Sequence, residues 1–202
     1  LGSRAVFGLA MFEEAKKRDN LMIITCDVST SAGLDRYRKK FPEKYVDLGI
    51  SEQNLIGVAS GLSHEGYDVI TTTFSPFQTL RCCEQIKVNS GYMKNKIVMV
   101  GLASGLCLGT LGFTHCSIED VGSIRSIPNV DIISPSDCLE TIKAVKASFE
   151  HKNSIYIRLT GTSNTGIVNK KDYKFEIGKS IQLESYGNDF AIISCGSLVK
   201  NC

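Results

Sequence analysis

The sequence lacks three features that would define several classes of protein. No apolar run reaches the roughly 20 residues that a membrane-spanning helix needs. The formal net charge is only +2 over 202 residues, which does not favour nucleic acid or a membrane surface as a partner. The eight cysteines form no CxxC pair, and three histidines are few for a metal site. We therefore expect no metal ligands in this chain, and reduced, partly buried cysteines in a cytoplasmic protein.

The start of the chain shows no secretory signal, because residues 1–18 are amphipathic and include acidic side chains. The sequence does not begin with methionine, which suggests a fragment of a longer protein. Hydrophobic residues make up 43% and charged residues 22%, as in ordinary globular proteins. The length suits one core and the start of a second domain.

Short apolar runs and helical patterns alternate along the first 160 residues. Runs typical of buried strands occur at 21–24, 44–48, 67–73, 96–100, 130–133 and 154–159. Helical spacing or start signals occur at 4–17, 54–64, 76–92, 118–126 and 137–150. Repeated strand–helix units predict an α/β fold class, with a parallel β-sheet of about six strands and helices on both faces.

The composition changes after residue 160. Residues 161–174 are rich in Gly, Thr, Ser, Asn and Lys, which is typical of a linker. Residues 175–202 hold strand-like runs at 180–183 and 190–194 but are too short for an independent α/β domain. We therefore expect a domain at 1–160, a linker at 161–174 and the truncated start of another domain at 175–202.

Candidate site residues follow the predicted strands. Ligands of an open parallel sheet bind beyond the carboxyl ends of its strands, so these segments are the places to look. A Gly-rich loop from 101 to 115 follows the fourth strand but lacks the GxGxxG and P-loop patterns. The polar and aromatic candidates at the strand ends are Asp27, Ser31, Glu52, Phe74, Phe77, His115 and Arg158.

Glu52 is the most informative of these residues. It lies between a predicted strand and an apolar helix that would otherwise bury it, and a buried carboxylate needs a partner or its pKa rises. On spacing alone, stabilisation of the helix N-terminus is the favoured interpretation.

The other candidates also have structural interpretations. Phe74 and Phe77 could belong to the core, and His115 could be a structural loop histidine. Arg4 and Arg158 would by default be solvated or surface-paired charges.

Several motifs in residues 3–160 together resemble the pyrimidine-binding domain of transketolases. In chain order they are YVDLGISEQN at 45–54, TFSPF at 73–77, GFTHCSIED at 112–120, RSIPN at 125–129 and IISPSD at 132–137. The ordered set is far more specific than any single motif. The tail from about 175 resembles the opening of the third domain of that family.

The resemblance implies a thiamine diphosphate site in which Glu52 and His115 are catalytic. Glu52 is expected to hydrogen-bond the aminopyrimidine nitrogen opposite the exocyclic amine, which favours the imino tautomer. The imino group can then remove the thiazolium proton, and the cofactor carries the carbanion chemistry. Phe74 and Phe77 match positions that pack on the pyrimidine. His115 matches a histidine that assists proton transfer at the substrate carbonyl, and Asp27 matches an acidic residue near the cofactor.

The implied reaction transfers a two-carbon ketol unit between sugar phosphates. Arg4 and Arg158 match phosphate-binding arginines, and Ser31 falls where a phosphate-contacting serine is expected. A guanidinium fork suits phosphate oxygens. Two departures leave the sugar specificity open: Leu111 stands where many transketolases have an Asp that reads a sugar hydroxyl, and the run Gly101–Ser104 lacks a second histidine.

The diphosphate-binding half of the site is missing from the chain, because no Gly-Asp-Gly…Asn motif occurs. We therefore expect a partner, an N-terminal diphosphate-binding transketolase subunit or domain, which would hold the diphosphate and a divalent metal, Mg or Ca. The resemblance implies assembly as a homodimer or heterotetramer, in which an apolar face of this chain pairs with another chain.

Two alternatives stay open. One is a related thiamine enzyme, such as a 1-deoxyxylulose-5-phosphate synthase or a 2-oxoacid dehydrogenase beta subunit. The sequences TH at 114–115 and IPN at 127–129 favour the transketolase group over the dehydrogenases. The other is a non-catalytic partner subunit: Leu111 and Ala103 motivate it, whereas Glu52 and His115 argue against it.

Overall fold

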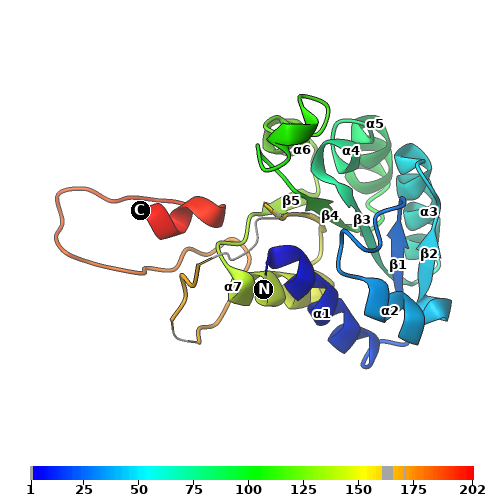
Figure 1. The fold of residues 1–202 in the computed structure, drawn as a ribbon, viewed down its shortest axis with the longest axis horizontal. Helices are drawn as coiled ribbons and strands as arrows, with labels where there is room; N and C mark the ends of the chain where they lie inside the picture. The colour runs from blue at the N-terminus through cyan, green and yellow to red at the C-terminus, as the bar shows by residue number, and fades with distance from the viewer. Residues whose placement is uncertain (1, 161–165, 171) are drawn as a thin grey trace.

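A six-stranded, entirely parallel sheet forms the centre of the fold in the computed structural model, which describes residues 2–160, 166–170 and 172–202 (Figure 1). The strand order is β2-β1-β3-β4-β6-β5. The predicted α/β fold class and the number of strands are confirmed. The strands are β1 (Leu21–Thr25), β2 (Tyr45–Asp47), β3 (Asp68–Phe74), β4 (Val98–Leu102), β5 (Val130–Ile133) and β6 (Ser154–Arg158).

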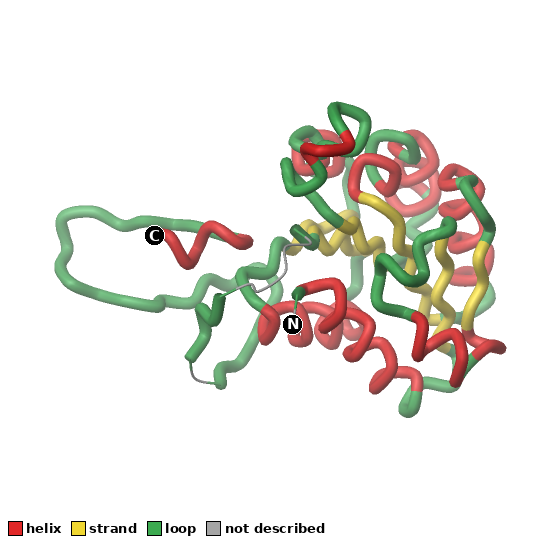
Figure 2. Tube along the Cα trace, viewed as in Figure 1, coloured by secondary structure: helices red, strands yellow, loops and turns green. Residues whose placement is uncertain are grey.

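Helices cover both faces of this sheet (Figure 2). One core cluster joins the strands to α1 and α7, with Phe7, Met11 and Val145 fully buried. A second cluster joins the opposite face to α3 and α5, through Leu55 and Ile86. The α-helices are α1 (Ser3–Ala15), α2 (Asp35–Lys40), α3 (Glu52–His64), α4 (Ser75–Gln78), α5 (Cys83–Ile86), α6 (Asp120–Ile124) and α7 (Cys138–Glu150). The remaining helical turns are η1 (Pro42–Lys44), η2 (Lys87–Tyr92), η3 (Gly109–Leu111) and η4 (Gly196–Asn201).

The helix predicted at 76–92 is broken into three pieces, α4, α5 and the π-helical η2. The break follows Thr79, whose hydroxyl donates to the carbonyl oxygen of Ser75 at 2.7 Å. The Sγ of Cys82 likewise contacts the carbonyl oxygen of Phe77 at 3.0 Å. Such local side-chain bonds to the backbone compete with a regular helix. The interruption gives the segment after β3 a compact turn at the edge of the sheet.

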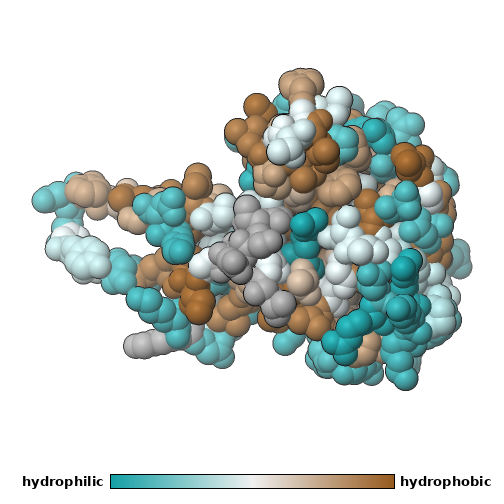
Figure 3. All heavy atoms as spheres, viewed as in Figure 1, coloured by the Kyte–Doolittle hydropathy of each residue, from teal (hydrophilic) through white to brown (hydrophobic). Residues whose placement is uncertain are grey.

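The tail does not contain the strands predicted at 180–183 and 190–194. A strand needs a neighbour to pair its backbone groups, and none of the described residues supplies one to these runs. Their apolar side chains, among them Ile181, Phe190 and Ile193, are exposed along the extended segment (Figure 3). At the end of this segment, Gly196 donates its N–H to the carbonyl oxygen of Ser134 at 2.9 Å.

The described part of the predicted linker contacts the start of α7. The backbone N–H groups of Val168 and Asn169 donate to Oδ2 of Asp137 at 3.0 and 2.9 Å. Residues 161–165 and 171 lie outside the described residues. In the ranges that the structure describes, no helix has both the length and the apolar character required to cross a bilayer.

Candidate active site

The predicted site residues follow strands whose carboxyl ends lie along one edge of the sheet. Thr25, at the end of β1, is in register with both Asp47 of β2 and Thr72 of β3. On the other side, Phe74 pairs with Leu102, and β4 continues in register to Arg158 of β6. The parallel register therefore places the segments that contain Glu52, Phe74, His115 and Arg158 at the same edge.

Asp47 organises the two turns at one end of this edge. Its Oδ1 accepts hydrogen bonds from the backbone N–H groups of Asp27 and Gly49, both at 2.9 Å. Its Oδ2 accepts from the hydroxyls of Thr25 at 2.9 Å and Tyr45 at 3.2 Å. Partial burial opposes ionisation, but these hydrogen bonds outweigh it and lower the pKa of Asp47. Asp27 and Gly49 both have positive φ, of 55° and 66°, so the carboxylate stabilises two unusual backbone conformations. Sequence reasoning missed Asp47.

Glu52 is the first residue of α3, and its side chain is only 4% exposed. Its Oε2 lies 2.7 Å from Nη1 of Arg81, in the segment between α4 and α5. Gln53 adds a contact to the same segment, because its Nε2 donates to the carbonyl oxygen of Arg81 at 3.2 Å. The buried carboxylate thus has the partner that the sequence argument required, and that partner was not predicted.

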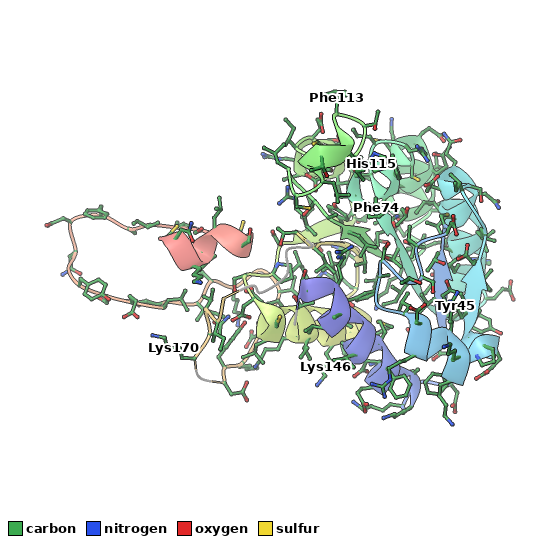
Figure 4. All side chains as sticks on the ribbon, in the orientation of Figure 1. Tyr45, Phe74, Phe113, His115, Lys146 and Lys170 are labelled. Atoms are coloured by element: carbon green, nitrogen blue, oxygen red, sulfur yellow. The ribbon has the colours of Figure 1, made fainter. Side chains whose placement is uncertain are left out.

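Phe74, Phe77 and His115 form an aromatic cluster next to this ion pair. The guanidinium of Arg81 lies 4.0 Å from the ring centroid of Phe77. Ring centroids are 5.2 Å apart for Phe77 and His115, 6.1 Å for Phe74 and His115, and 6.4 Å for the two phenylalanines. All three pairs are edge-on. Figure 4 shows Phe74 and His115 close together, with Phe113 farther out on the same loop.

The aromatic cluster is half-buried, so its rings remain partly accessible at the edge of the sheet. Phe74 also packs against the core cluster that contains α1 and α7, which partly agrees with the core interpretation. The structure therefore brings Glu52, Phe74, Phe77 and His115 together, joined by Arg81.

The thiols close to Glu52 are poor nucleophiles. Burial, and then the negative charge of Glu52, raises the pKa of Cys82 to about 12. Burial also raises the pKa of Cys26 to about 11, although a backbone hydrogen bond from Ser51 opposes it. Both groups are therefore protonated at neutral pH. Within the described ranges no cysteine forms a disulfide, and no group of three His, Cys, Asp or Glu could hold a metal ion.

Arg158 is not the solvated or surface-paired charge expected by default from the sequence, because it is paired with a buried carboxylate. Its Nε donates to Oδ2 of Asp120 at 2.7 Å, and Asp120 is fully buried. Its Nη2 also reaches the carbonyl oxygen of Ser117 at 3.4 Å. Ser117 belongs to the loop of His115, and it closes that loop by an antiparallel bridge to Gly105.

Arg158 lies near the start of this loop, because its Nη2 would be 3.6 Å from a Cβ atom on Gly105. Partial burial raises the pKa of the Cys107 thiol, while the positive charges of Arg4 and Arg158 act to lower it. Ser31 is half-buried and Asp27 is exposed, and no side-chain contact among the described residues joins either to the aromatic cluster or to the arginines. Their predicted roles stay predictions.

The chain is thus an α/β protein with an open parallel sheet, and the buried carboxylate, the aromatic rings and Arg158 lie at the carboxyl edge, where proteins of this class bind their ligands. A family model described as "Transketolase, pyrimidine binding domain" matches residues 1–164. The chain belongs to this family, as its ordered motifs implied.

Relatives of this chain include subunits of divided transketolases. A subunit of apulose-4-phosphate transketolase from Phocaeicola vulgatus is 30% identical over 199 residues, which cover 98% of this chain and 64% of the relative. The 6-deoxy-6-sulfo-D-fructose transketolase subunit SqwH of a Clostridium species is 31% identical, over 94% of this chain and 58% of that protein. A solved structure titled "Split gene transketolase, inactive beta4 tetramer" has a TM-score of 0.82 and 31% identity, over 92% of this chain and 60% of that one. The chain spans less than two thirds of the length of each.

Proposed function

We propose that this chain is the pyrimidine-binding part of a thiamine diphosphate-dependent transketolase, which transfers a two-carbon ketol unit between sugar phosphates. The observation that carries this proposal is the buried Glu52 carboxylate, held by Arg81 beside the aromatic cluster at the ligand-binding edge. The family match and the names of the relatives support the same reaction class.

The residues present fit one end of thiamine diphosphate. Glu52 offers a buried carboxylate to a ring nitrogen, and the half-buried Phe74 and Phe77 suit the face or edge of a flat heteroaromatic ring. The other end has no counterpart here, because the sequence has no Gly-Asp-Gly…Asn motif. When bound, the cofactor supplies the electron sink for carbanion chemistry. The diphosphate and a divalent metal, Mg or Ca, belong to the proposed partner.

The protein residues have distinct roles in this proposal. Glu52 orients the aminopyrimidine and holds a negative charge beside it. Arg81 offsets the cost of burying that charge, since an unpaired buried carboxylate is strongly destabilising. His115 moves a proton at the substrate carbonyl, and Asp27 lies near the cofactor. Because the side chain of Glu52 is only 4% exposed, its electrostatic interactions are stronger than they would be in water.

The substrate phosphate is assigned to the other part of the edge. The positive charges of Arg4 and Arg158 both act on the thiol of Cys107, and two guanidinium groups provide the planar donors that phosphate oxygens prefer. Ser31 is proposed as a further phosphate contact. Leu111 and Phe113 are 55% and 85% exposed on the intervening loop, so the region where many transketolases read a sugar hydroxyl is apolar here.

The complete enzyme needs a partner. We propose an N-terminal diphosphate-binding transketolase subunit or domain, assembled with this chain as a homodimer or heterotetramer. Division of the enzyme into subunits is stated in the names of two relatives, and one solved relative is titled a beta4 tetramer. A cytoplasmic location remains a prediction from the pattern of cysteines.

The proposal is tested by reconstitution. This chain is combined with a diphosphate-binding transketolase subunit, thiamine diphosphate and Mg²⁺, and ketol transfer is measured over a panel of phosphorylated ketose donors and aldose acceptors. We expect transfer with at least one pair, and its loss in Glu52→Gln. Formation of a stable complex that is inactive over the whole panel would instead support the non-catalytic partner subunit.

A further inference from the structure

A buried polar network lies beneath the proposed phosphate site. It consists of Ser75, Ser117, Asp120, Tyr156 and Arg158. Oδ2 of Asp120 accepts hydrogen bonds from Nε of Arg158 at 2.7 Å, the hydroxyl of Tyr156 at 2.9 Å and the hydroxyl of Ser75 at 3.1 Å. The hydroxyl of Ser117 in turn donates to that of Ser75 at 3.1 Å. One carboxylate thus joins β6, α4, α6 and the loop of His115.

The backbone of β4 is adapted to this network. A Cβ atom on Gly101 would lie 2.5 Å from the hydroxyl oxygen of Tyr156, so a glycine is needed for that ring to reach Asp120. Burial, and then the charge of Asp120, raises the pKa of Tyr156 well above its ordinary value. Tyr156 is therefore a hydrogen-bond donor throughout the neutral range. The network is fully buried except at Arg158, whose side chain is 20% exposed.

Arg158 is the member of the network that reaches the edge of the sheet. Its bonds to Asp120 through Nε and to Ser117 through Nη2 use two of the five N–H groups of a guanidinium. These contacts fix the plane of the group, so its remaining donors have a set direction. A fixed planar fork loses less conformational entropy when it binds an anion than a mobile side chain does.

We propose that Asp120 is a positioning residue for recognition of the substrate phosphate. The carboxylate holds Arg158 by its Nε, which directs the terminal nitrogens toward the phosphate. Through Ser75 and Ser117 it also sets the position of Arg158 relative to the turn of Phe74 and the loop of His115. This inference rests on the proposed function in one respect, namely that Arg158 binds the substrate phosphate.

The first test compares two acceptors with the same carbon skeleton, one phosphorylated and one not, in the complex with the diphosphate-binding partner. Asp120→Asn keeps the size of the side chain but removes the charge that strengthens the bond to Arg158. We expect the KM of the phosphorylated acceptor to rise about tenfold, with a smaller change in kcat. The kcat/KM of the unphosphorylated acceptor should change little. An equal loss for both acceptors would reduce Asp120 to a structural role and overturn the inference.

Two further variants separate positioning from general destabilisation. Tyr156→Phe removes one hydrogen bond to Asp120 but leaves the pair with Arg158, so it should lower the melting temperature and keep the preference for phosphate. Arg158→Ala should strongly reduce that preference, and Asp120→Asn should add no further loss in the Arg158→Ala background. Loss of the preference in Tyr156→Phe, or additive losses in the double variant, would contradict the inference.

A binding measurement gives a readout that does not depend on turnover. Inorganic phosphate is titrated into the complex by calorimetry at constant ionic strength. We expect Asp120→Asn to weaken binding about tenfold and Tyr156→Phe to leave it nearly unchanged. If these phosphate affinities are found in a complex that shows no ketol transfer, the positioning role of Asp120 is supported although the proposed function fails. Equal phosphate binding by wild type and Asp120→Asn, or none in the wild type, would overturn the positioning role even in an active enzyme.

Discussion

The two ends of the candidate site use the same kind of ion pair for different purposes. Glu52 and Asp120 are both buried carboxylates, and each lies 2.7 Å from a guanidinium nitrogen. Oδ2 of Asp120 also accepts hydrogen bonds from two hydroxyl groups, and the side chain of its partner Arg158 is 20% exposed. Arg81, the partner of Glu52, has a side chain that is 41% exposed and lies against the partly accessible aromatic cluster. The pair of Glu52 and Arg81 is therefore suited to meet a ligand through its carboxylate. The pair of Asp120 and Arg158 is suited to meet a ligand through its arginine.

The largest effect on stability should come from Asp120. Asp120→Ala leaves Arg158, Tyr156 and Ser75 without their common acceptor, and we expect the free energy of unfolding to fall by roughly 3–5 kcal/mol. Glu52→Ala should cost clearly less, because Arg81 can turn to solvent. Denaturant unfolding of both variants measures the difference. Equal losses would mean that the two pairs are equivalent and that the comparison fails.

For catalytic activity the order of the two carboxylates should be reversed, with the larger effect at Glu52. Glu52→Gln keeps the shape of the side chain and removes its charge, and we expect kcat in the reconstituted complex to fall by about 10²-fold or more. The melting temperature should change little. Glu43→Gln, on the exposed η1, is the matched control and should leave kcat unchanged. A Glu52→Gln variant with full activity would remove Glu52 from the catalytic site.

Gly101 tests whether the Asp120 network is as tightly packed as its geometry indicates. Gly101→Ala places a Cβ against the ring of Tyr156, and we expect a loss of roughly 1–3 kcal/mol in unfolding free energy from overpacking. Tyr156→Phe removes the hydroxyl, which is the closest atom, so the cost of Gly101→Ala should be smaller in that background. Simple additivity of the two changes would show that the network relaxes freely.

The smallest effect should come from Asp47, and it should depend on pH. The pKa of Asp47 is lowered in the folded chain, so its ionised form contributes stability above the unfolded pKa of about 4. That contribution is lost as the pH falls through the lower folded value. Asp47→Asn should therefore be less stable than wild type at pH 7, and the two should converge in acid. A stability difference that is constant from pH 7 to pH 2 would contradict this account.

The sequence predicted the sheet well because its evidence is local. Six short apolar runs marked the six strands, and Asp137 was recognised at the start of α7, where its Oδ1 accepts the backbone N–H of Glu140 at 2.8 Å. The same local evidence gave a wrong prediction of strands at 180–183 and 190–194, because a strand-like run forms a strand only where a neighbouring strand can pair with its backbone.

The partners of the site residues were less predictable because they come from distant parts of the chain. Arg81 lies 29 positions from Glu52, and its approach depends on the break between α4 and α5. Ser75 and Tyr156 are 81 positions apart, and the hydroxyls meet only after β3, β4 and β6 have paired. The motifs predicted candidate site residues, but not the partners that hold them in place.

The central claim is that Glu52 acts on the aminopyrimidine of thiamine diphosphate. The most direct measurement is the rate of proton–deuterium exchange at the thiazolium carbon of the cofactor bound to the reconstituted complex, compared between wild type and Glu52→Ala. We predict that exchange slows strongly in Glu52→Ala, at saturating cofactor, whereas it is unchanged in Asp120→Asn. An unchanged exchange rate in Glu52→Ala would contradict the proposed role of Glu52.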